Sequence, residues 1–175
     1  FSKKFSFSKE IKQARLYSVA HGLYEVAINE VKLSEEYLTP GYHSYDLLQQ
    51  YQTYDVTECL IEDTEISFVV GNGWYRGRFL FEGGFENIYG DKQKLIAELH
   101  VEYTDGTLEQ FYSDETWTVE TNYIQENSIY DGEIINYTAE INALTTEVID
   151  VTTLLLAPRL DLPVEVVAEF QPRIF

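Results

Sequence analysis

Regular alternation of apolar and polar residues along short runs constrains this chain more than any other feature. In LYEVAIN, residues 23–29, the side chains of Tyr24, Val26 and Ile28 fall on one face, which is the more apolar of the two. The run LIAELHVEY, residues 95–103, could also be a helix, but its apolar residues recur at every second position. A period of two is typical of a β-strand that buries one face. Both runs are therefore predicted to be strands.

Turn signals separate the predicted strands. The dipeptide Asp105-Gly106 stands between two alternating runs and favours a hairpin with a type I′ turn, which needs positive φ at both central residues. The dipeptide His21-Gly22 predicts a further turn. Other runs with strand character are ARLYSVA at 14–20, YQTYDVTECL at 51–60, EISFVV at 65–70 and ETWTVET at 115–121.

Short strands separated by turns predict an all-β fold, an antiparallel β-sandwich of jelly-roll-like form. We expect one such domain over residues 1–175, with EISFVV buried on both faces. The closing tail, residues 154–175, contains Pro158, Pro163 and Pro172. These prolines divide it into short extended pieces suited to sheet edges or to docking.

Composition narrows the classes of function. The formal net charge of −18 repels phosphate groups, which argues against nucleic acid and anionic membrane surfaces as partners. No run approaches the roughly 20 apolar residues of a membrane helix. The one cysteine, Cys59, excludes an internal disulfide and is expected to be a small buried apolar residue. The histidines lack zinc-site spacing, and the absence of methionine indicates a piece of a longer protein.

The glycine spacing of GNGWYRGRF, residues 71–79, resembles that of a dinucleotide-binding loop. Such a loop must open a helix whose N-terminus holds the pyrophosphate, and the residues after Gly77 favour extended structure instead. We therefore predict a sharp strand connection, with positive φ at Gly73. Of the two aromatic residues that follow, Trp74 is expected to pack inward on the core or on a following domain, and the alternative is a sugar platform.

Six stretches occur in one order along the chain: ARLYSVAHGLYEVAIN at 14–29, LTPGYHSY at 38–45, YQTYDVTECL at 51–60, VVGNGWYRGRF at 69–79, YTDGTLEQFYSDETW at 103–117 and SIYDGEIINY at 128–137. Together with the ending LLLAPRLDLPVEVVAEFQP, they resemble the N-terminal β-sandwich domain of bacterial α-L-rhamnosidases. These are large inverting glycosidases that remove terminal L-rhamnose.

The resemblance implies a parent enzyme of several domains, in the bacterial cytoplasm, with this domain in an accessory role. In the family the reaction takes place in a following helical barrel, where one carboxyl group is the general acid and another activates water. The catalytic motif of that barrel does not occur in this sequence. No catalytic residue is therefore assigned, and the expected partner is the catalytic domain of the same chain.

The resemblance also suggests where sugar and calcium would bind. Some family members hold L-rhamnose through a calcium ion coordinated by Asp and Asn side chains and backbone carbonyls, the oxygen ligands that calcium prefers. Asn29 matches a position often filled by Asn, but Glu30 replaces the usual glycine. The family's Asn-and-Pro pattern after the glycine turn is replaced by WYRGRF, so a turn role for Asn29 is favoured. Trp74, Tyr75 and Arg78 are the other candidate carbohydrate-binding residues.

The segment YDGE supplies Tyr130, Asp131 and Glu133, which are expected on a loop that faces the catalytic domain, at the rim of its active site. No metal ligand is assigned. Three functions remain open: an accessory domain that supports the catalytic barrel, a rhamnose-binding module that uses calcium, and a purely structural or oligomer-forming domain. The departures from the calcium pattern favour the first.

Overall fold

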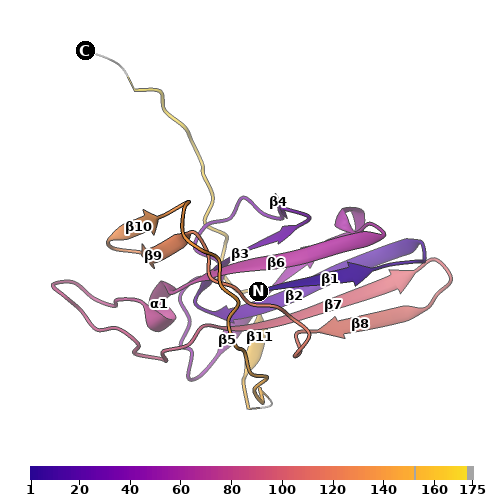
Figure 1. The fold of residues 1–175 in the computed structure, drawn as a ribbon, viewed down its shortest axis with the longest axis horizontal. Coiled ribbons are helices and arrows are strands. Elements are labelled where there is room, and N and C mark those ends of the chain that lie inside the picture. The colour runs from indigo at the N-terminus through magenta and orange to yellow at the C-terminus, as the bar shows by residue number, and fades with distance from the viewer. Residues whose placement is uncertain (152, 173–175) are drawn as a thin grey trace.

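Two β-sheets form the body of the computed structural model, which describes residues 1–151 and 153–172 (Figure 1). The four-stranded sheet has the order β1-β6-β3-β4, with β1 at Ser2–Ser6, β3 at Leu23–Ile28, β4 at Val31–Lys32 and β6 at Asp63–Gly71. The five-stranded sheet has the order β11-β5-β2-β7-β8, with β2 at Ile11–His21, β5 at Gln49–Asp55, β7 at Lys94–Tyr103, β8 at Leu108–Tyr112 and β11 at Leu156–Pro158.

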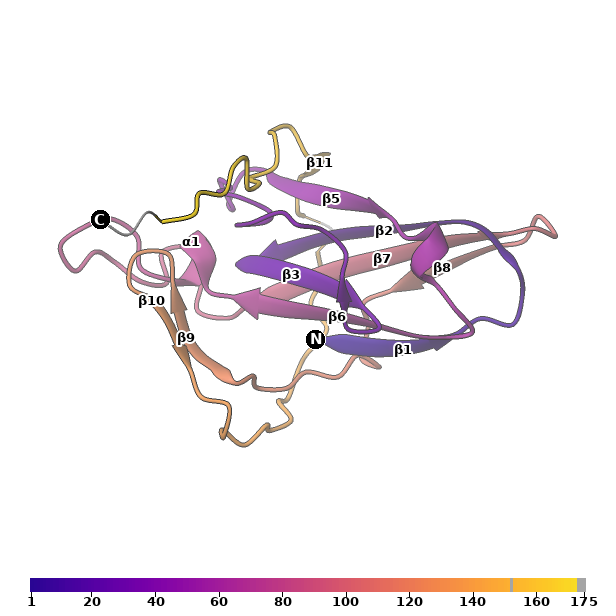
Figure 2. The same ribbon diagram turned by 90° about the horizontal axis from the view of Figure 1, so that it is seen from above.

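Three smaller elements complete the fold. They are the hairpin β9–β10, at Ile124–Ser128 and Gly132–Ile135, the 3₁₀ turn η1 at Thr57–Cys59 and the short helix α1 at Gly73–Arg76. Figure 2 shows the hairpin and α1 at the same end of the molecule. All strand pairs are antiparallel except β11 with β5. The predicted all-β sandwich is confirmed, and in the part of the chain that the structure describes no helix is long and apolar enough to cross a membrane.

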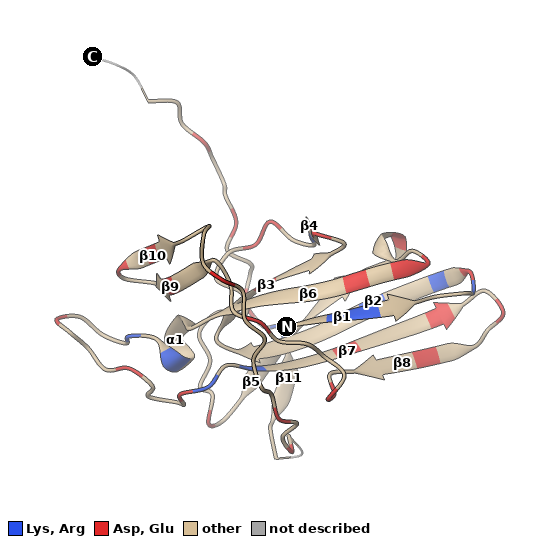
Figure 3. Ribbon diagram, in the orientation of Figure 1, with Lys and Arg blue, Asp and Glu red and all other residues tan. Residues whose placement is uncertain are grey.

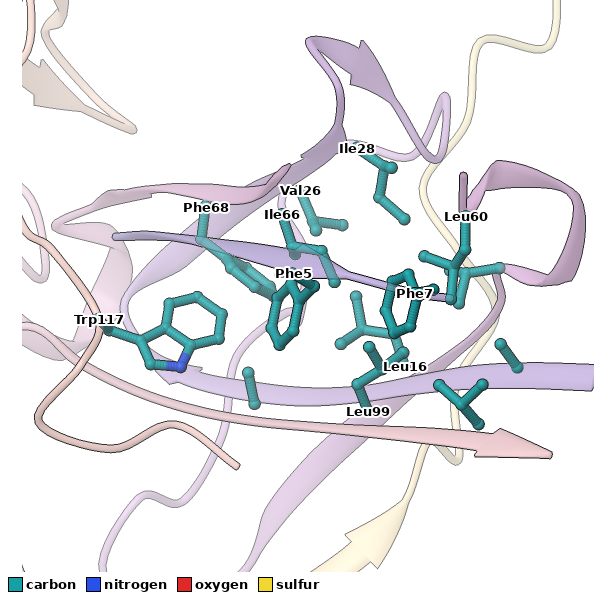
Figure 4. Close-up of a cluster of buried hydrophobic side chains, with 14 of the residues drawn as sticks. Phe5, Phe7, Leu16, Val26, Ile28, Leu60, Ile66, Phe68, Leu99 and Trp117 are labelled. Atoms are coloured by element: carbon teal, nitrogen blue, oxygen red, sulfur yellow. The ribbon is translucent and has the colours of Figure 1, made fainter. Parts of the chain in front are cut away.

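The core lies between the two sheets and follows the alternation of the sequence (Figure 4). Tyr24, Val26 and Ile28 are buried in β3, while the alternate residues of that strand are partly or fully exposed. In β7, Ala97, Leu99, Val101 and Tyr103 are buried, which confirms a strand over a helix. Burial of each large aliphatic side chain stabilises the fold by about 1.5–3 kcal/mol.

Gly22 carries the chain from one sheet to the other. It lies between β2 and β3, which belong to different sheets, and has a φ of +135°. A Cβ at this position would lie 2.2 Å from the carbonyl oxygen of Gly71. The turn predicted at His21-Gly22 is therefore a crossover between layers, and its tightness requires glycine.

Two predictions about individual strands are wrong. EISFVV is buried on one face only, because the outer face of the four-stranded sheet is open and leaves Val69 44% exposed. Residues 115–121 form no strand: Asp114 Oδ1 accepts the backbone N–H of Thr116, and this local turn leaves only isolated bridges at Thr118 and Glu120.

The β7–β8 hairpin exists, but not with a type I′ turn. Only Gly106 of the dipeptide has a positive φ, +83°. Its N–H donates to the carbonyl of Tyr103, and Asp105 Oδ1 accepts the N–H of Thr107. The side chain of Asp105 thus stabilises a longer turn that needs only one left-handed residue.

The tail is extended, as predicted. Pro158 lies in β11, an edge strand, where its missing N–H costs no ladder hydrogen bond. Beyond β11 the backbone N–H of Tyr37 donates to Val164, and this contact ties part of the tail to the loop after β4. Residues 173–175 of the predicted tail lie outside the described residues.

Candidate functional site

The glycine turn after β6 opens a single turn of helix, α1, in place of the predicted return to a strand. Gly73 has the expected positive φ, +53°, and a Cβ there would lie 2.8 Å from Leu23 Cγ and 2.9 Å from Leu23 N. Both features demand glycine. Four residues of helix lead into a long loop rather than a βαβ unit, so the turn remains unlike a dinucleotide site.

Helical geometry reverses the roles predicted for the two aromatic residues of this turn. Tyr75 is the inward ring, 3% exposed, with ring centroids 4.3 Å from His21 and 5.0 Å from Tyr45. Trp74 is half-buried and meets the edge of Tyr42 at 6.1 Å. Successive helical side chains point about 100° apart, so strand alternation does not apply here. The prediction that Trp74 packs in the sandwich core is therefore wrong. Tyr75 is buried and has no open face for a sugar.

Buried polar groups lie beside Tyr75. His21 Nε2 is 2.9 Å from Gln49 Oε1, and Gln49 Nε2 donates to the carbonyl of Tyr45. Both nitrogens of His43, which is 2% exposed, have no hydrogen-bond partner among the described residues. Burial lowers the pKa of His21 and of His43 and raises the pKa of Tyr45. These rings are therefore neutral at pH 7 and pack as part of the interior.

Two groups of predicted residues meet at Arg78. Its Nε and Nη2 donate to Asp131 Oδ2 at 3.0 Å and Oδ1 at 2.8 Å, across 53 positions in the sequence. Its guanidinium carbon lies 4.7 Å from the ring centroid of Tyr130. Ser128 also donates to Asp131, and the hydrogen bonds from Arg78 and Ser128 lower the pKa of Asp131. The loop after α1 is thereby clamped to the β9–β10 hairpin through a bidentate contact.

A second contact fixes this hairpin close to its turn. Asn127 Oδ1 of β9 accepts the backbone N–H of Asn72 at 2.9 Å. A Cβ at Gly71 would lie 2.8 Å from the same oxygen, so this close approach also depends on glycine. Figures 1 and 2 both show β9–β10 beside α1.

Of the remaining predicted residues, Asn29 lies apart from this cluster. Asn29 begins the β3–β4 turn with a φ of +49°, and its Oδ1 accepts the N–H of Glu65, as a turn residue does. It stands at the opposite end of β3 from Leu23, which pairs with Gly71. Glu133 is exposed on β10, opposite Asn127.

Large exposed apolar side chains occur on both segments that the Arg78–Asp131 contact joins, namely the loop after α1 and the β9–β10 hairpin with the residues that follow it. We call this surface the apolar rim; it comprises Leu80, Phe81, Phe85, Ile88, Tyr130, Ile134, Ile135 and Tyr137. Phe81 is 79% exposed and meets the edge of Tyr130 at 5.8 Å, which joins the two segments of the rim. The sequence contains no sign of this contact, since nothing local indicates that Phe81 meets Tyr130, 49 positions further along the chain.

Acidic residues do not gather at this end. Figure 3 shows Asp and Glu spread over both sheets and the connecting loops, with a basic segment on α1. Within residues 1–151 and 153–172, no three His, Cys, Asp or Glu side chains lie together as metal ligands would. Calcium also uses Asn and backbone carbonyls, so the calcium-dependent alternative stays a prediction.

Comparison with known proteins places this fold in a family. The family model for the α-L-rhamnosidase N-terminal domain matches residues 9–174. An α-L-rhamnosidase of Formosa agariphila is 35% identical over 153 residues, which are 85% of this chain and 16% of that protein. The chain spans 12 to 20% of the length of the curated relatives that it matches.

Solved structures agree with this result. The α-L-rhamnosidase of Aspergillus terreus is 41% identical with a TM-score of 0.73, over 75% of this chain and 15% of that one. The α-L-rhamnosidase of Streptomyces avermitilis, solved with L-rhamnose, is 35% identical with a TM-score of 0.71, over 75% and 13% of the two chains. The chain belongs to the α-L-rhamnosidase N-terminal domain family.

Proposed function

We propose that this chain is the non-catalytic accessory domain of an α-L-rhamnosidase and supports the domain that hydrolyses terminal α-L-rhamnose. Family membership and the small share of each relative that it spans support this role. Asp131, the most constrained acid of the candidate site, has a lowered pKa and is bound to Arg78. A general acid of an inverting glycosidase needs the opposite, a raised pKa.

The apolar rim is the main structural observation that supports this accessory role. Contiguous exposed apolar surface marks interaction sites, and Tyr, Phe and Arg are enriched at the centres of interfaces. The bidentate Arg78–Asp131 contact holds the two segments of the rim together before any partner binds. Docking therefore costs little conformational entropy. We propose that the partner is another domain of the same enzyme.

The tail offers a second apolar surface for the same partner. Its large exposed apolar side chains are Leu155, Leu156, Leu160, Leu162, Val164, Val166, Val167 and Phe170, and the last two are 97% and 89% exposed. Side chains of this kind in an extended segment gain stability only when another surface covers them.

A matched pair of variants in the full rhamnosidase tests the docking role. Phe81→Ser removes a 79% exposed ring from the rim, and Leu108→Ser removes a 74% exposed side chain from the far β7–β8 hairpin. We expect Phe81→Ser to lower the melting temperature of the enzyme by several degrees, since an interface ring contributes about 2 kcal/mol. Leu108→Ser should leave the melting temperature unchanged. In the isolated chain both variants should melt like the wild type, and an equal effect of the two in the enzyme would exclude docking through the rim.

A rhamnose-binding role is the second candidate. The half-buried Trp74 and Arg78 lie near each other in sequence at the candidate site, and the Streptomyces avermitilis relative was solved with L-rhamnose. Calorimetric titration of L-rhamnose with and without calcium, on the wild type and on Trp74→Ala, separates this role from docking. Binding that needs both calcium and Trp74 would favour the module.

A further inference from the structure

A groove opens where β5 loses its outer neighbour. β11 pairs with β5 only from Gln49 to Tyr51, so the rest of that edge is left uncovered by any strand of the described chain. The groove there has a volume of about 470 Å³, within the range of sites for small molecules. Tyr51, Tyr54 and Pro158 are among its lining residues; the ring of Tyr51 contacts Tyr17, whereas Tyr54 lies on the opposite face of β5 and contacts Tyr24. It shares no residue with the α1 site or the apolar rim.

The polar wall of the groove contains N–H donors that have no hydrogen-bond partner within the described part of the chain. Gln52 is 2% exposed, and its Nε2 is buried without a hydrogen-bond partner in the described residues. Arg159 Nη1 donates to Glu36 Oε2 at 2.5 Å, while Arg159 Nε has no hydrogen bond and only the charge of Asp161 Oδ1 at 3.5 Å. An unpaired buried donor destabilises the fold. Gln52 is among the lining residues of the groove, and the last torsion of a glutamine side chain is soft, so the proposal requires its amide to rotate toward a bound acceptor.

These groups select the chemistry of an occupant. Free N–H donors disfavour a metal cation, and the carboxylates of Glu36, Asp55 and Asp161 disfavour an anion. Hydroxyl groups satisfy both kinds of wall, because each one accepts from a donor and donates to a carboxylate. The ring of Tyr54, which lies on the same face of β5 as Gln52, suits the apolar face of a pyranose. We propose that the groove binds a neutral monosaccharide, with Gln52 and Arg159 as donors and Glu36 as acceptor.

Cys59 reports on the groove directly. It lines the groove and is the one cysteine of the chain. A sugar in the groove should slow the reaction of this thiol with a disulfide reagent at least about twofold, with a Kd on the order of millimolar for so small a ligand. The probes are L-rhamnose, D-galactose and D-mannose. EDTA is present with each, so that calcium-dependent binding elsewhere on the chain does not occur. Free glutathione corrects for direct effects of sugar on the reagent.

Matched variants and charged probes complete the experiment. Gln52→Leu removes the unpaired amide. It should raise the sugar concentration needed for half-maximal protection of Cys59 about tenfold, the effect of one hydrogen bond on the Kd. Gln110→Leu, on exposed β8, should leave protection unchanged. In the wild type, the Gln52 side-chain N–H₂ resonances should shift on titration, a readout that needs no variant. The proposal fails if none of the three sugars protects Cys59. It fails equally if D-galacturonate or phosphate protects better than the neutral sugars, or if Gln52→Leu is protected like the wild type.

Discussion

Adjacent aromatic residues at the α1 end have different surroundings, and their contributions to stability should differ accordingly. Tyr75 is enclosed by His21, Tyr45 and Gly90, where a Cβ would lie 2.2 Å from the tyrosine hydroxyl. Trp74 has one open side. Size alone would rank the tryptophan as the greater contributor, so burial and residue volume make opposite predictions for this pair.

Tyr75→Ala should destabilise the isolated chain by about 3–5 kcal/mol, because it leaves a cavity among the rings that surround it. Trp74→Ala should cost about 1 kcal/mol, since the ring is already partly in water. Urea denaturation of the two variants measures both values. A larger loss for Trp74→Ala than for Tyr75→Ala would show that the inward ring has been misassigned.

The buried histidines make stability depend on pH. Burial lowers the pKa of His21 and His43 below the value of about 6.5 that they have in the unfolded chain. Lys94 faces His21 and lowers its pKa further, while Asp161 acts in the opposite sense on His43. Below pH 6.5 the unfolded chain takes up protons that the folded chain does not, so unfolding becomes more favourable.

We therefore expect the urea midpoint to fall as the pH drops from about 6.5 toward the lowered pKa values of the two histidines. His43→Leu removes one of the two groups and should flatten the fall. The measurement is a series of urea melts between about pH 7.5 and about pH 5.5, a range above the usual pKa of carboxylates. A midpoint that rises on acidification would contradict the neutral, buried state of these rings.

The glycine turn and the β9–β10 hairpin form one unit at the scale of elements. Gly73 packs against Leu23 of β3, and Asn72 binds Asn127 of β9. The helix, the four-stranded sheet and the hairpin thus meet within three residues of chain. A change in the turn should therefore disturb all three elements.

Gly73→Ala and Gly106→Ala separate backbone strain from steric contact. Both glycines have positive φ, +53° and +83°, which costs an alanine about 1–2 kcal/mol. A Cβ at Gly106 has nothing within 4 Å, whereas at Gly73 it meets the backbone of Leu23 at 2.9 Å. Gly73→Ala should therefore destabilise the chain by at least about 1 kcal/mol more than Gly106→Ala in urea melts. Equal losses would mean that the turn moves freely away from β3.

Some features of these elements follow from local sequence order, and others depend on contacts between distant segments. The alternation in 23–29 and 95–103 predicted strands correctly because it depends only on local order and one buried face. The burial of EISFVV could not be predicted, since it depends on whether another layer covers the outer face. The pairing of Arg78 with Asp131 joins residues 53 positions apart, which no local pattern contains. A helix of four residues was enough to exchange the environments of Trp74 and Tyr75.

At the scale of the whole molecule, the chain is a complete two-sheet core with apolar surface left over. The sandwich buries its own inner faces, yet the rim and the tail remain exposed. A single domain of this size gains little from such surface unless a partner covers it. We propose that this partner performs the hydrolysis and that this chain does not.

Hydrolysis of nitrophenyl α-L-rhamnoside by the isolated chain tests that claim most directly. The positive control is a full-length relative, such as the α-L-rhamnosidase of Streptomyces avermitilis. We expect no release of nitrophenol above the buffer blank, at any chain concentration. Turnover that co-elutes with the chain through repurification and rises in proportion to its concentration would show that the chain is itself a catalyst.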